Sequence, residues 1–209
     1  LGTQEFCGLE FTVNPAVLIP RPETELLIRH VVAYAQAVSD ATIVDVGTGS
    51  GCVAITLATC LQGRRVMAID RSPEALAVAR CNAMRHGVCD RIEWLEGDLL
   101  APLSGRMAAH SVHVIVSNPP YISQADWAGL EPEVRVFEPR MALIGGEQGT
   151  EFHERLLRES RELLVPGGLL VMEIGAGQAA AVRRLAGQIG GYATLEVAED
   201  AAGIERVVV

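Results

Sequence analysis

Basic residues are scarce in this sequence. Its 209 residues include 17 Lys and Arg against 26 Asp and Glu, so the formal net charge is −9. A protein that grips a long nucleic-acid backbone normally presents a basic patch, because neutralised phosphates supply much of its affinity. The acidic balance therefore makes a direct nucleic-acid partner unexpected.

Long hydrophobic runs, paired cysteines and metal-ligand clusters are missing as well. No stretch reaches the roughly 20 apolar residues of a membrane helix, and residues 1–11 lack the basic start and apolar run of a signal peptide. The five cysteines form no C-x-x-C pair, which indicates reduced thiols in a cytoplasmic protein. His110 and His113 have no third ligand at metal spacing, so no metal site is expected.

What the sequence does contain is an alternation of short β-branched runs and helical patterns from Ala41 onward. This alternation is typical of a parallel sheet whose strands are joined by crossover helices. Strands are expected near residues 42–46, 65–69, 91–95, 112–116, 168–174, 193–197 and 206–209. Helices are expected near residues 23–37, 51–61, 73–86, 150–164 and 178–188. The length suits one well-filled α/β domain.

Several residues mark where these elements begin and end. Ser72 before Pro73 is a typical N-cap, and Gly87 is a plausible C-cap for the same helix. Residues 166–168 (P-G-G) are expected to end the 150–164 helix and turn into the next strand. Before that helix lies a predicted loop of about 30 residues with four prolines, and loops of such length are usually functional.

A glycine-rich turn, residues 47–51 (G-T-G-S-G), joins the first strand to the first helix. Its glycines let the backbone bend sharply and approach a ligand closely. Asp70 ends the second strand, 19 residues after Gly51, where a carboxylate can accept both ribose hydroxyls of an adenosine. The G-x-G-x-G spacing, preceded by Asp45, favours a zwitterionic adenosyl ligand such as S-adenosylmethionine over NAD. The plainer alternative is a tight strand–helix turn without a ligand.

Asp98 ends the third predicted strand at the same edge of the sheet. Its carboxylate is placed to accept a hydrogen bond from an adenine amino group. The alternative, an ordinary loop or cap aspartate, is almost as well supported by the sequence.

The tetrapeptide Asn118-Pro119-Pro120-Tyr121 follows the fourth strand, which is expected to lie beside the first. A planar –NH2 group is a poor nucleophile because its lone pair is delocalised. Two acceptors, the Asn118 side-chain oxygen and the Pro119 carbonyl, would hold both N–H groups and turn the lone pair towards a methyl donor. The prolines fix the backbone, and Tyr121 can stack on the substrate. A rigid turn alone would explain only the prolines.

Seven segments together resemble the HemK/PrmC family, the peptide chain release factor glutamine methyltransferases. They are residues 6–11 (F-x-G-L-x-F), 19–25 (I-P-R-P-E-T-E), 44–51 (V-D-V-G-T-G-S-G), 117–122 (S-N-P-P-Y-I), 137–143 (F-E-P-R-x-A-L), 172–175 (M-E-I-G) and 205–207 (E-R-V). The resemblance implies a class I S-adenosylmethionine-dependent methyltransferase (Rossmann-like) fold. Its mostly parallel sheet would have seven strands, the last one antiparallel.

The resemblance also implies roles for individual residues. S-adenosylmethionine would bind at Gly47, Thr48, Gly49, Ser50, Gly51, Asp70, Asp98, Leu99 and Asn118. The catalytic residues would be Asn118, Pro119 and Tyr121, and Pro120 would join them in contacting the substrate. Leu99 stands where family members often have an aromatic residue near the adenine, which puts stacking at that position in doubt.

By the same resemblance, the substrate is the glutamine of the Gly-Gly-Gln loop in class 1 release factors, methylated on its side-chain amide nitrogen. Residues 1–40 would form a hairpin-like start and a helix packed on a catalytic domain at residues 41–209. The family's N-terminal helical domain is absent, and the chain opens without Met, which suggests a fragment. Two other acceptors remain open, adenine N6 in DNA or RNA and a ribosomal-protein glutamine. A catalytically idle adenosyl-binding module is a further alternative.

Four charged residues have no assigned role at this point. Arg21 and Glu23 either form a local salt bridge and helix-dipole contact or belong to a segment that folds over the cofactor, which the resemblance favours. Glu138 and Arg140, in the long predicted loop, either contact the partner or are solvated.

Overall fold

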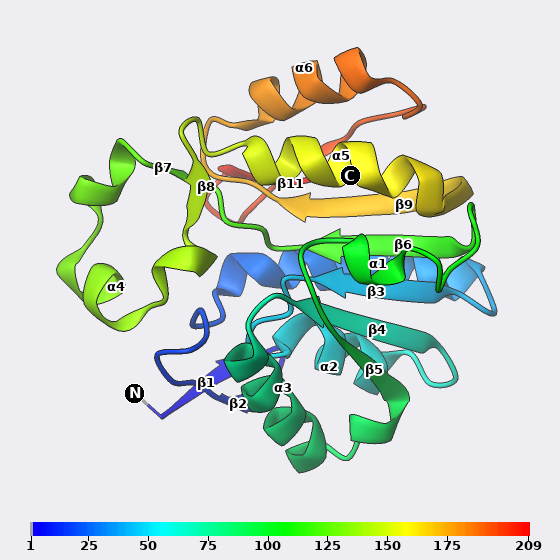
Figure 1. The fold of residues 1–209 in the computed structure, drawn as a ribbon, viewed down its shortest axis with the longest axis horizontal. Coiled ribbons are helices and arrows are strands. Elements are labelled where there is room, and N and C mark those ends of the chain that lie inside the picture. Colours follow the sequence, from blue (N-terminus) through cyan, green and yellow to red (C-terminus); the bar gives the residue numbers. More distant parts are fainter. Residues whose placement is uncertain (1) are drawn as a thin grey trace.

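A seven-stranded sheet forms the centre of the computed structural model, which describes residues 2–209 (Figure 1). Its strand order is β10-β11-β9-β6-β3-β4-β5. The strands are β3 (Thr42–Val46), β4 (Arg65–Asp70), β5 (Ile92–Glu96), β6 (Val112–Ser117), β9 (Leu164–Glu173), β10 (Val197–Glu199) and β11 (Glu205–Val208). Only β11 runs antiparallel to its neighbours β9 and β10. The predicted fold class is therefore confirmed.

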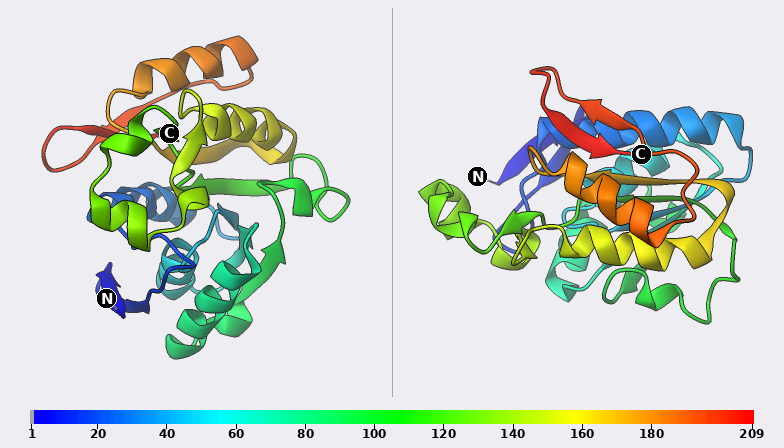
Figure 2. Two further views of the ribbon diagram at one scale, coloured as in Figure 1. Left: turned by 60° about the vertical axis from the view of Figure 1, so that its left-hand side comes forward. Right: turned by 90° about the horizontal axis from the view of Figure 1, so that it is seen from above.

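Helices cover both faces of this sheet. α1 (Glu25–Ala37), α2 (Cys52–Cys60) and α3 (Pro73–Arg85) precede β3, β4 and β5, and α5 (Glu151–Leu163) and α6 (Ala179–Ile189) flank β9 in sequence. Figure 2 shows α1 and α5 on opposite sides of the strands. Successive residues of β3 pack into different cores, Ile43 with α1 and α2, and Val44 with α5 and α6. Burial of both faces explains the continuous apolar strands seen in the sequence.

The predicted ends of α3 are confirmed. The Ser72 hydroxyl accepts a hydrogen bond from the Ala75 amide at 3.0 Å, which satisfies one free donor of the first turn. Gly87, just after the C-cap His86, has φ +67°. A glycine there continues the chain in the left-handed region without a Cβ penalty.

Two strand boundaries predicted from the sequence are wrong. α5 ends at Leu163 and β9 begins at once, so residues 166–168 lie inside the strand rather than before it. The pairing with β6 shifts register there, from Val112 opposite Leu164 to Val114 opposite Leu169. A bulge thus absorbs the Pro and Gly residues that predicted a turn. β10 lies at Val197–Glu199, later than expected, because its position follows its pairing with β11.

The long predicted loop between β6 and α5 is not structureless. It contains β7 (Ile122–Ser123), α4 (Pro132–Phe137) and β8 (Ile144–Gly146), together with two short 3-10 turns, η4 (Asp126–Gly129) and η5 (Arg140–Ala142). β7 and β8 form a small parallel sheet of their own. Strands of two and three residues carry too little periodicity to be read from the sequence. In Figure 1 this part of the chain lies beyond the carboxyl ends of the central strands.

The N-terminal residues form a hairpin of β1 (Thr3–Phe6) and β2 (Leu9–Thr12), followed by the 3-10 turn η1 (Pro22–Thr24). Cys7 and Gly8 both have positive φ, as a two-residue hairpin turn of type I′ requires. Phe6 and Phe11 are fully buried and meet edge to face at 6.2 Å. The Asn82 side chain of α3 bonds to both backbone groups of Thr12. These contacts hold the hairpin on the helical layer.

Residues 2–209 include no helix that is both long and apolar enough to cross a membrane. The five cysteines are all free thiols. No group of three or more His, Cys, Asp or Glu side chains within residues 2–209 is arranged to hold a metal ion.

Candidate active site

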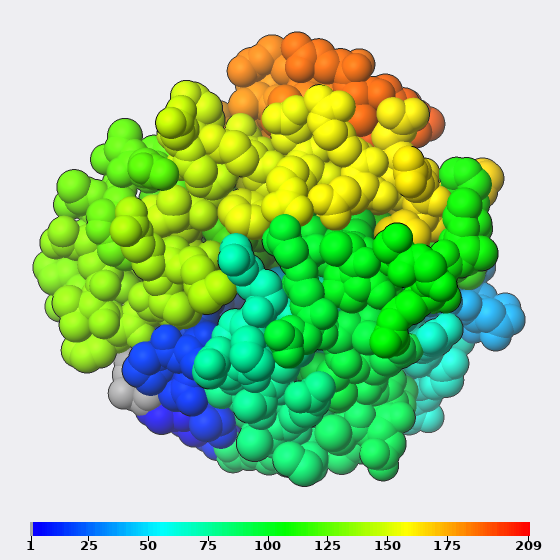
Figure 3. Space-filling view, in the orientation of Figure 1, coloured from blue at the N-terminus to red at the C-terminus, as the bar shows by residue number. Residues whose placement is uncertain are grey.

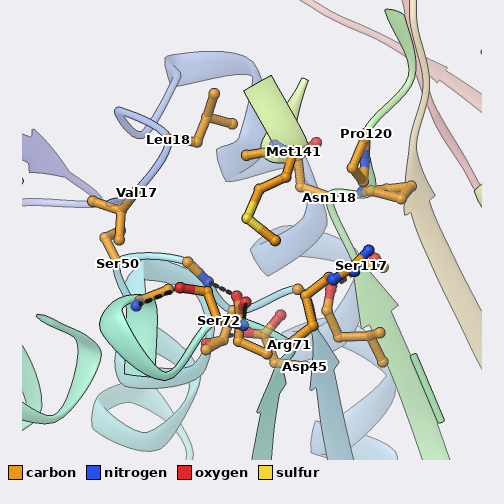
Figure 4. A pocket seen from close by; sticks show the side chains of 18 of the residues that line it. Val17, Leu18, Asp45, Ser50, Arg71, Ser72, Ser117, Asn118, Pro120 and Met141 are labelled. Atoms are coloured by element: carbon orange, nitrogen blue, oxygen red, sulfur yellow. Dashed lines mark hydrogen bonds between the residues drawn. The ribbon is translucent and has the colours of Figure 1, made fainter. Parts of the chain in front are cut away.

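A cavity opens at the carboxyl edge of the central strands. The space between its walls, including the mouth that is open to solvent, is about 1020 Å³. Its walls come from residues 47–50 of the glycine-rich turn, the start of α2, the ends of β4 and β6, and Phe152, together with residues 16–18, 20, 24, 97–99, 139, 141 and 142. In Figure 4, Met141 reaches into this space opposite Asp45 and Ser72. The topology thus brings the predicted motifs to one cavity, although Gly51 and Tyr121 are not among the described residues that line it.

The glycine-rich turn has little room for side chains. Gly47, Gly49 and Gly51 all have positive φ. A Cβ on Gly51 would lie 2.8 Å from Ile55 Cδ1 and 3.1 Å from Ala79 Cβ, so the turn could not keep its position between α2 and α3. The Gly47 and Thr48 amides both donate to the Ile69 carbonyl at 2.9 Å, which ties the turn to the end of β4. The turn is therefore a rigid wall of the cavity.

Asp45 braces this turn from inside. Its side chain is 1% exposed and accepts hydrogen bonds from the Thr48 hydroxyl at 2.6 Å and the Ala54 amide at 3.2 Å. Burial raises the pKa of Asp45 to about 7, against the opposing effect of these two bonds. The carboxyl group thus serves the turn as well as lining the cavity.

The buried Asp45 gives stability a pH dependence of known sign. Its pKa is higher in the folded chain than in the unfolded chain, so its stabilising contribution is full below its ordinary pKa and is lost as pH rises towards about 7. We expect the free energy of unfolding to fall between about pH 4 and about pH 7 in urea titrations, and Asp45→Asn to remove part of that slope. Equal slopes in the two proteins would contradict this.

Asp70 stands at the end of β4, where the sequence predicted a ribose-binding carboxylate. One oxygen accepts from the Gly49 amide at 2.8 Å and the other from the Ser72 amide at 2.9 Å. Burial raises its pKa, against the lowering effect of those amides. Each carboxylate oxygen keeps a further lone pair, so Asp70 can still accept from hydroxyl groups in the cavity.

Asp98 and Leu99 lie on the other side of the mouth. The Asp98 carboxylate pairs with Arg155 of α5 at 2.7 Å, and both side chains are about half exposed. Leu99 is 8% exposed and has φ +46°, an uncommon conformation for a residue with a branched side chain. An aromatic ring that the sequence did not indicate, Phe152 of α5, also lines the cavity. The helical pattern of α5 gave no reason to single it out.

Asn118, Pro119 and Pro120 line the same cavity, whereas Tyr121 is not among the described residues that do. The Asn118 Nδ2 group donates to the Thr24 hydroxyl oxygen at 3.2 Å. The Tyr121 hydroxyl instead donates to Glu173 at 3.3 Å, and burial raises its pKa. Stacking of Tyr121 on a substrate therefore stays a prediction, while Asn118 faces the cavity beside the glycine-rich turn.

The backbone of the tetrapeptide is clamped by residues that the sequence did not single out. Gln178 Nε2 donates to the Tyr121 carbonyl at 2.8 Å. Gly145 and Gly149 pack against the same stretch. A Cβ on Gly145 would lie 2.5 Å from the Pro120 carbonyl oxygen, and a Cβ on Gly149 would lie 2.4 Å from the Tyr121 carbonyl oxygen. The prolines stiffen the tetrapeptide from within, and these neighbours hold it from outside.

Ala16, Val17, Leu18 and Pro20 form part of the cavity wall, whereas Arg21 and Glu23 are not among the described residues that line it, so their predicted role over the cofactor stays a prediction. The Arg21 guanidinium pairs with Glu138, whose other oxygen accepts from the Ile19 amide at 3.4 Å. Figure 3 shows the N-terminal segment against the 120–145 segment at the surface. Glu138 is 7% exposed, so the expectation that it is solvated is wrong, while a contact with the partner stays a prediction. Arg140 is exposed, as one of its two alternatives predicted, and its guanidinium lies 5.3 Å from the centre of the Trp127 ring.

The sequence is similar to those of known methyltransferases. Residues 22–130 match the family described as methyltransferase small domain. The release factor glutamine methyltransferase of Geobacter sulfurreducens is 45% identical over all of this chain and 70% of its own length. That of Moorella thermoacetica is 46% identical over 98% of this chain and 71% of its own length.

Solved structures share the fold at much lower identity. The human METTL16 catalytic domain in complex with an RNA hairpin has a TM-score of 0.74 at 18% identity, over 96% of this chain and 74% of that one. The N-terminal domain of human METTL16 in complex with SAH has a TM-score of 0.66 at 20% identity, over 96% of this chain and 75% of that one. At this identity the likeness concerns the fold alone.

Proposed function

Because this chain belongs to the release factor glutamine methyltransferases, we propose that it methylates the Gly-Gly-Gln glutamine of a class 1 peptide chain release factor. The methyl group goes from S-adenosylmethionine to the side-chain amide nitrogen. One observation carries the proposal: Asn118 faces the cavity that the glycine-rich turn and Asp70 also line, with its NH2 group held by Thr24. The Asn118 oxygen is thereby left to accept from a substrate amide.

The donor set of the cavity fits S-adenosylmethionine, which supplies a methyl group bound to a positively charged sulfur. Asp70 would accept the ribose hydroxyls, and residues 47–50 of the turn, which line the cavity, would let the ligand approach the backbone. Leu99 and Phe152 offer apolar surface for the adenine, with Asp98 beside them as an acceptor for its amino group. Phe152 can thus supply the aromatic surface that Leu99 does not offer.

Catalysis rests mainly on positioning. The Asn118 oxygen and the Pro119 carbonyl accept the two N–H groups of the glutamine side chain, so that its nitrogen lone pair turns towards the methyl group. Well-oriented reactions of this kind gain roughly 7–11 kcal/mol. No side chain needs to act as a strong base, because the nitrogen becomes acidic once it is alkylated. Pro119 and Pro120 keep the two acceptors aimed.

A protein acceptor also suits the surface beside the cavity. Val136 is 70% exposed and Phe137 is 63% exposed, both on α4, close in sequence to Pro139 and Met141 of the cavity wall. Exposed apolar side chains that lie next to each other can form a patch of the kind that marks contacts with another protein. The net charge of −9 is poorly suited to a nucleic-acid backbone.

The proposal is tested by incubating the protein with S-adenosylmethionine and a class 1 release factor. Mass spectrometry is expected to find a single added methyl group on the Gly-Gly-Gln glutamine. A release factor with that glutamine replaced by alanine is the matched control and should gain none. Duplex DNA, an RNA hairpin and ribosomal proteins are rival acceptors in parallel reactions. Methyl transfer to one of these and not to the release factor would contradict the proposal.

A further inference from the structure

The Asn118 side chain can work as an acceptor only in one of its two orientations. The oxygen and the nitrogen of a carboxamide have nearly the same shape but opposite hydrogen-bonding roles. Turned by half a rotation, Asn118 would present N–H groups to the substrate amide and repel it. Neighbouring groups in the protein must therefore fix whether the oxygen or the nitrogen of Asn118 faces the cavity.

We infer that Thr24 and Glu173 are positioning residues that hold the Asn118 amide with its oxygen towards the substrate, an inference that rests on the proposed function. Thr24 Oγ1 lies 2.7 Å from Glu173 Oε2 and 3.2 Å from Asn118 Nδ2. Thr24 belongs to the turn before α1, and Glu173 ends β9. Both residues lie in segments that carry the family resemblance, residues 19–25 and 172–175, but the sequence gave neither of them a role.

The chain of bonds has a direction because a hydroxyl has only one hydrogen. Thr24 gives that hydrogen to the Glu173 carboxylate, so towards Asn118 its oxygen can only accept. Asn118 must then turn its NH2 group to Thr24 and its oxygen the other way. Thr24 and Glu173 are both 2% exposed, so water does not compete for these positions.

The direction depends on Glu173 being ionised. As a carboxylate it accepts at both oxygens, from Thr24 and from the Tyr121 hydroxyl at 3.3 Å. A protonated Glu173 can donate to Thr24 instead, which frees the Thr24 hydrogen to point at Asn118 and favours the reversed amide. Burial raises the pKa of Glu173 to about 7, while the bonds from Thr24 and Tyr121 lower it.

Other ionisable groups also act on the Glu173 carboxylate or contact its backbone. Glu23 raises its pKa and Arg206 lowers it. The His153 ring, fully buried on α5, donates through Nε2 to the Glu173 carbonyl at 2.8 Å, and burial lowers the pKa of that ring. Glu173 also acts on Tyr121 and on the buried Cys52 thiol. Burial raises the pKa of both groups, that of Cys52 to about 12. Of these groups, Glu173 is the one poised to change charge near pH 7 while in contact with Thr24.

The test compares Thr24→Val, which removes the hydroxyl but keeps the shape, with Thr24→Ser, which keeps the hydroxyl. We expect Thr24→Val to lower kcat roughly ten- to hundredfold, as misaimed substrates do, with the affinity for S-adenosylhomocysteine by calorimetry nearly unchanged. Thr24→Ser should restore most of kcat. Equal kcat in Thr24→Val and the wild type, or a matching decrease in ligand affinity, would overturn the inference.

The pH profile is a second arm that does not depend on the folding of Thr24→Val. In the wild type, kcat is expected to fall as pH drops through about 7, because Glu173 becomes protonated. Glu173→Gln cannot titrate and should lack this fall. A flat wild-type profile, or the same fall in Glu173→Gln, would overturn the inference.

A third readout needs no turnover. The side-chain NH2 signals of Asn118 in nitrogen-15 spectra, assigned by their absence in Asn118→Ala, should shift in Thr24→Val and titrate with Glu173 in the wild type. If the Asn118 signals shift neither in Thr24→Val nor with the titration of Glu173, the inference is overturned even when the enzyme is active. A wild type that transfers no methyl group to release factor, but shows these shifts, would count against the proposed function and leave the positioning intact.

Discussion

Replacing Asn118 by alanine is expected to lower kcat by about 10²–10³-fold, the loss typical for one preorganised hydrogen-bonding group at a reacting centre. The substrate nitrogen would keep only the Pro119 carbonyl as acceptor, so its lone pair would no longer be aimed. Affinity for S-adenosylhomocysteine should be largely kept, because the turn and Asp70 are untouched. Steady-state kinetics with release factor and calorimetry with S-adenosylhomocysteine measure the two quantities.

Gln124→Ala is the matched control for this experiment. It removes another side-chain amide from the same segment, at an exposed position outside the cavity lining. It should leave both quantities close to the wild-type values. If Asn118→Ala keeps its activity, the acceptor role is wrong. A parallel decrease in ligand affinity would mean that Asn118 acts mainly through the cofactor.

Asp70→Ala is expected to weaken S-adenosylhomocysteine binding by about 100-fold or more. Two hydrogen bonds to a carboxylate contribute about 1.5–3 kcal/mol each, and every 1.4 kcal/mol is about tenfold in affinity. The carboxylate also holds the Gly49 and Ser72 amides, so its removal loosens the turn as well. Asp70→Asn keeps the shape of the side chain without its charge. Its affinity for S-adenosylhomocysteine should lie between that of Asp70→Ala and that of the wild type.

Glu96→Ala is the control for Asp70. Glu96 lies directly opposite Asp70 on β5, carries the same charge, is exposed, and is not among the cavity-lining residues. Its replacement should leave the dissociation constant near the wild-type value. An equal decrease in ligand affinity in both variants would mean that negative charge near the cavity, and not a contact with the ribose, favours binding. Thermal unfolding of each variant separates a collapsed turn from a missing hydrogen bond to the ribose.

Local sequence patterns determined most of the architecture. β-branched runs alternating with helical periodicity predicted the strands from β3 to β6 and the helices between them, because each pattern lies within a few consecutive residues. The glycine-rich turn and Asp70 were found for the same reason. They follow successive strands, and in a parallel sheet the carboxyl ends of neighbouring strands meet at one edge.

Where the local sequence predicted a turn but a strand partner was available, strand pairing determined the structure. Residues 166–168 have the composition of a turn, yet they lie inside β9, since β6 offers it a partner on both sides of a bulge. β7 and β8 are too short to have a period and exist only because Ile122 and Ile144 meet in the folded chain. Strand pairing depends on a partner that a local window of sequence does not contain.

The sequence by itself determined the fold class, the turn at residues 47–51, Asp70 and the tetrapeptide at Asn118. Only the tertiary structure decided which residues complete the site: Thr24, 94 positions from Asn118, Glu173 at the end of β9, and Glu138 paired with Arg21. The physical reason is the separation along the sequence of the residues that interact. Turns and periodic faces are properties of neighbouring residues, whereas a hydrogen bond between distant side chains depends on where the folded backbone returns.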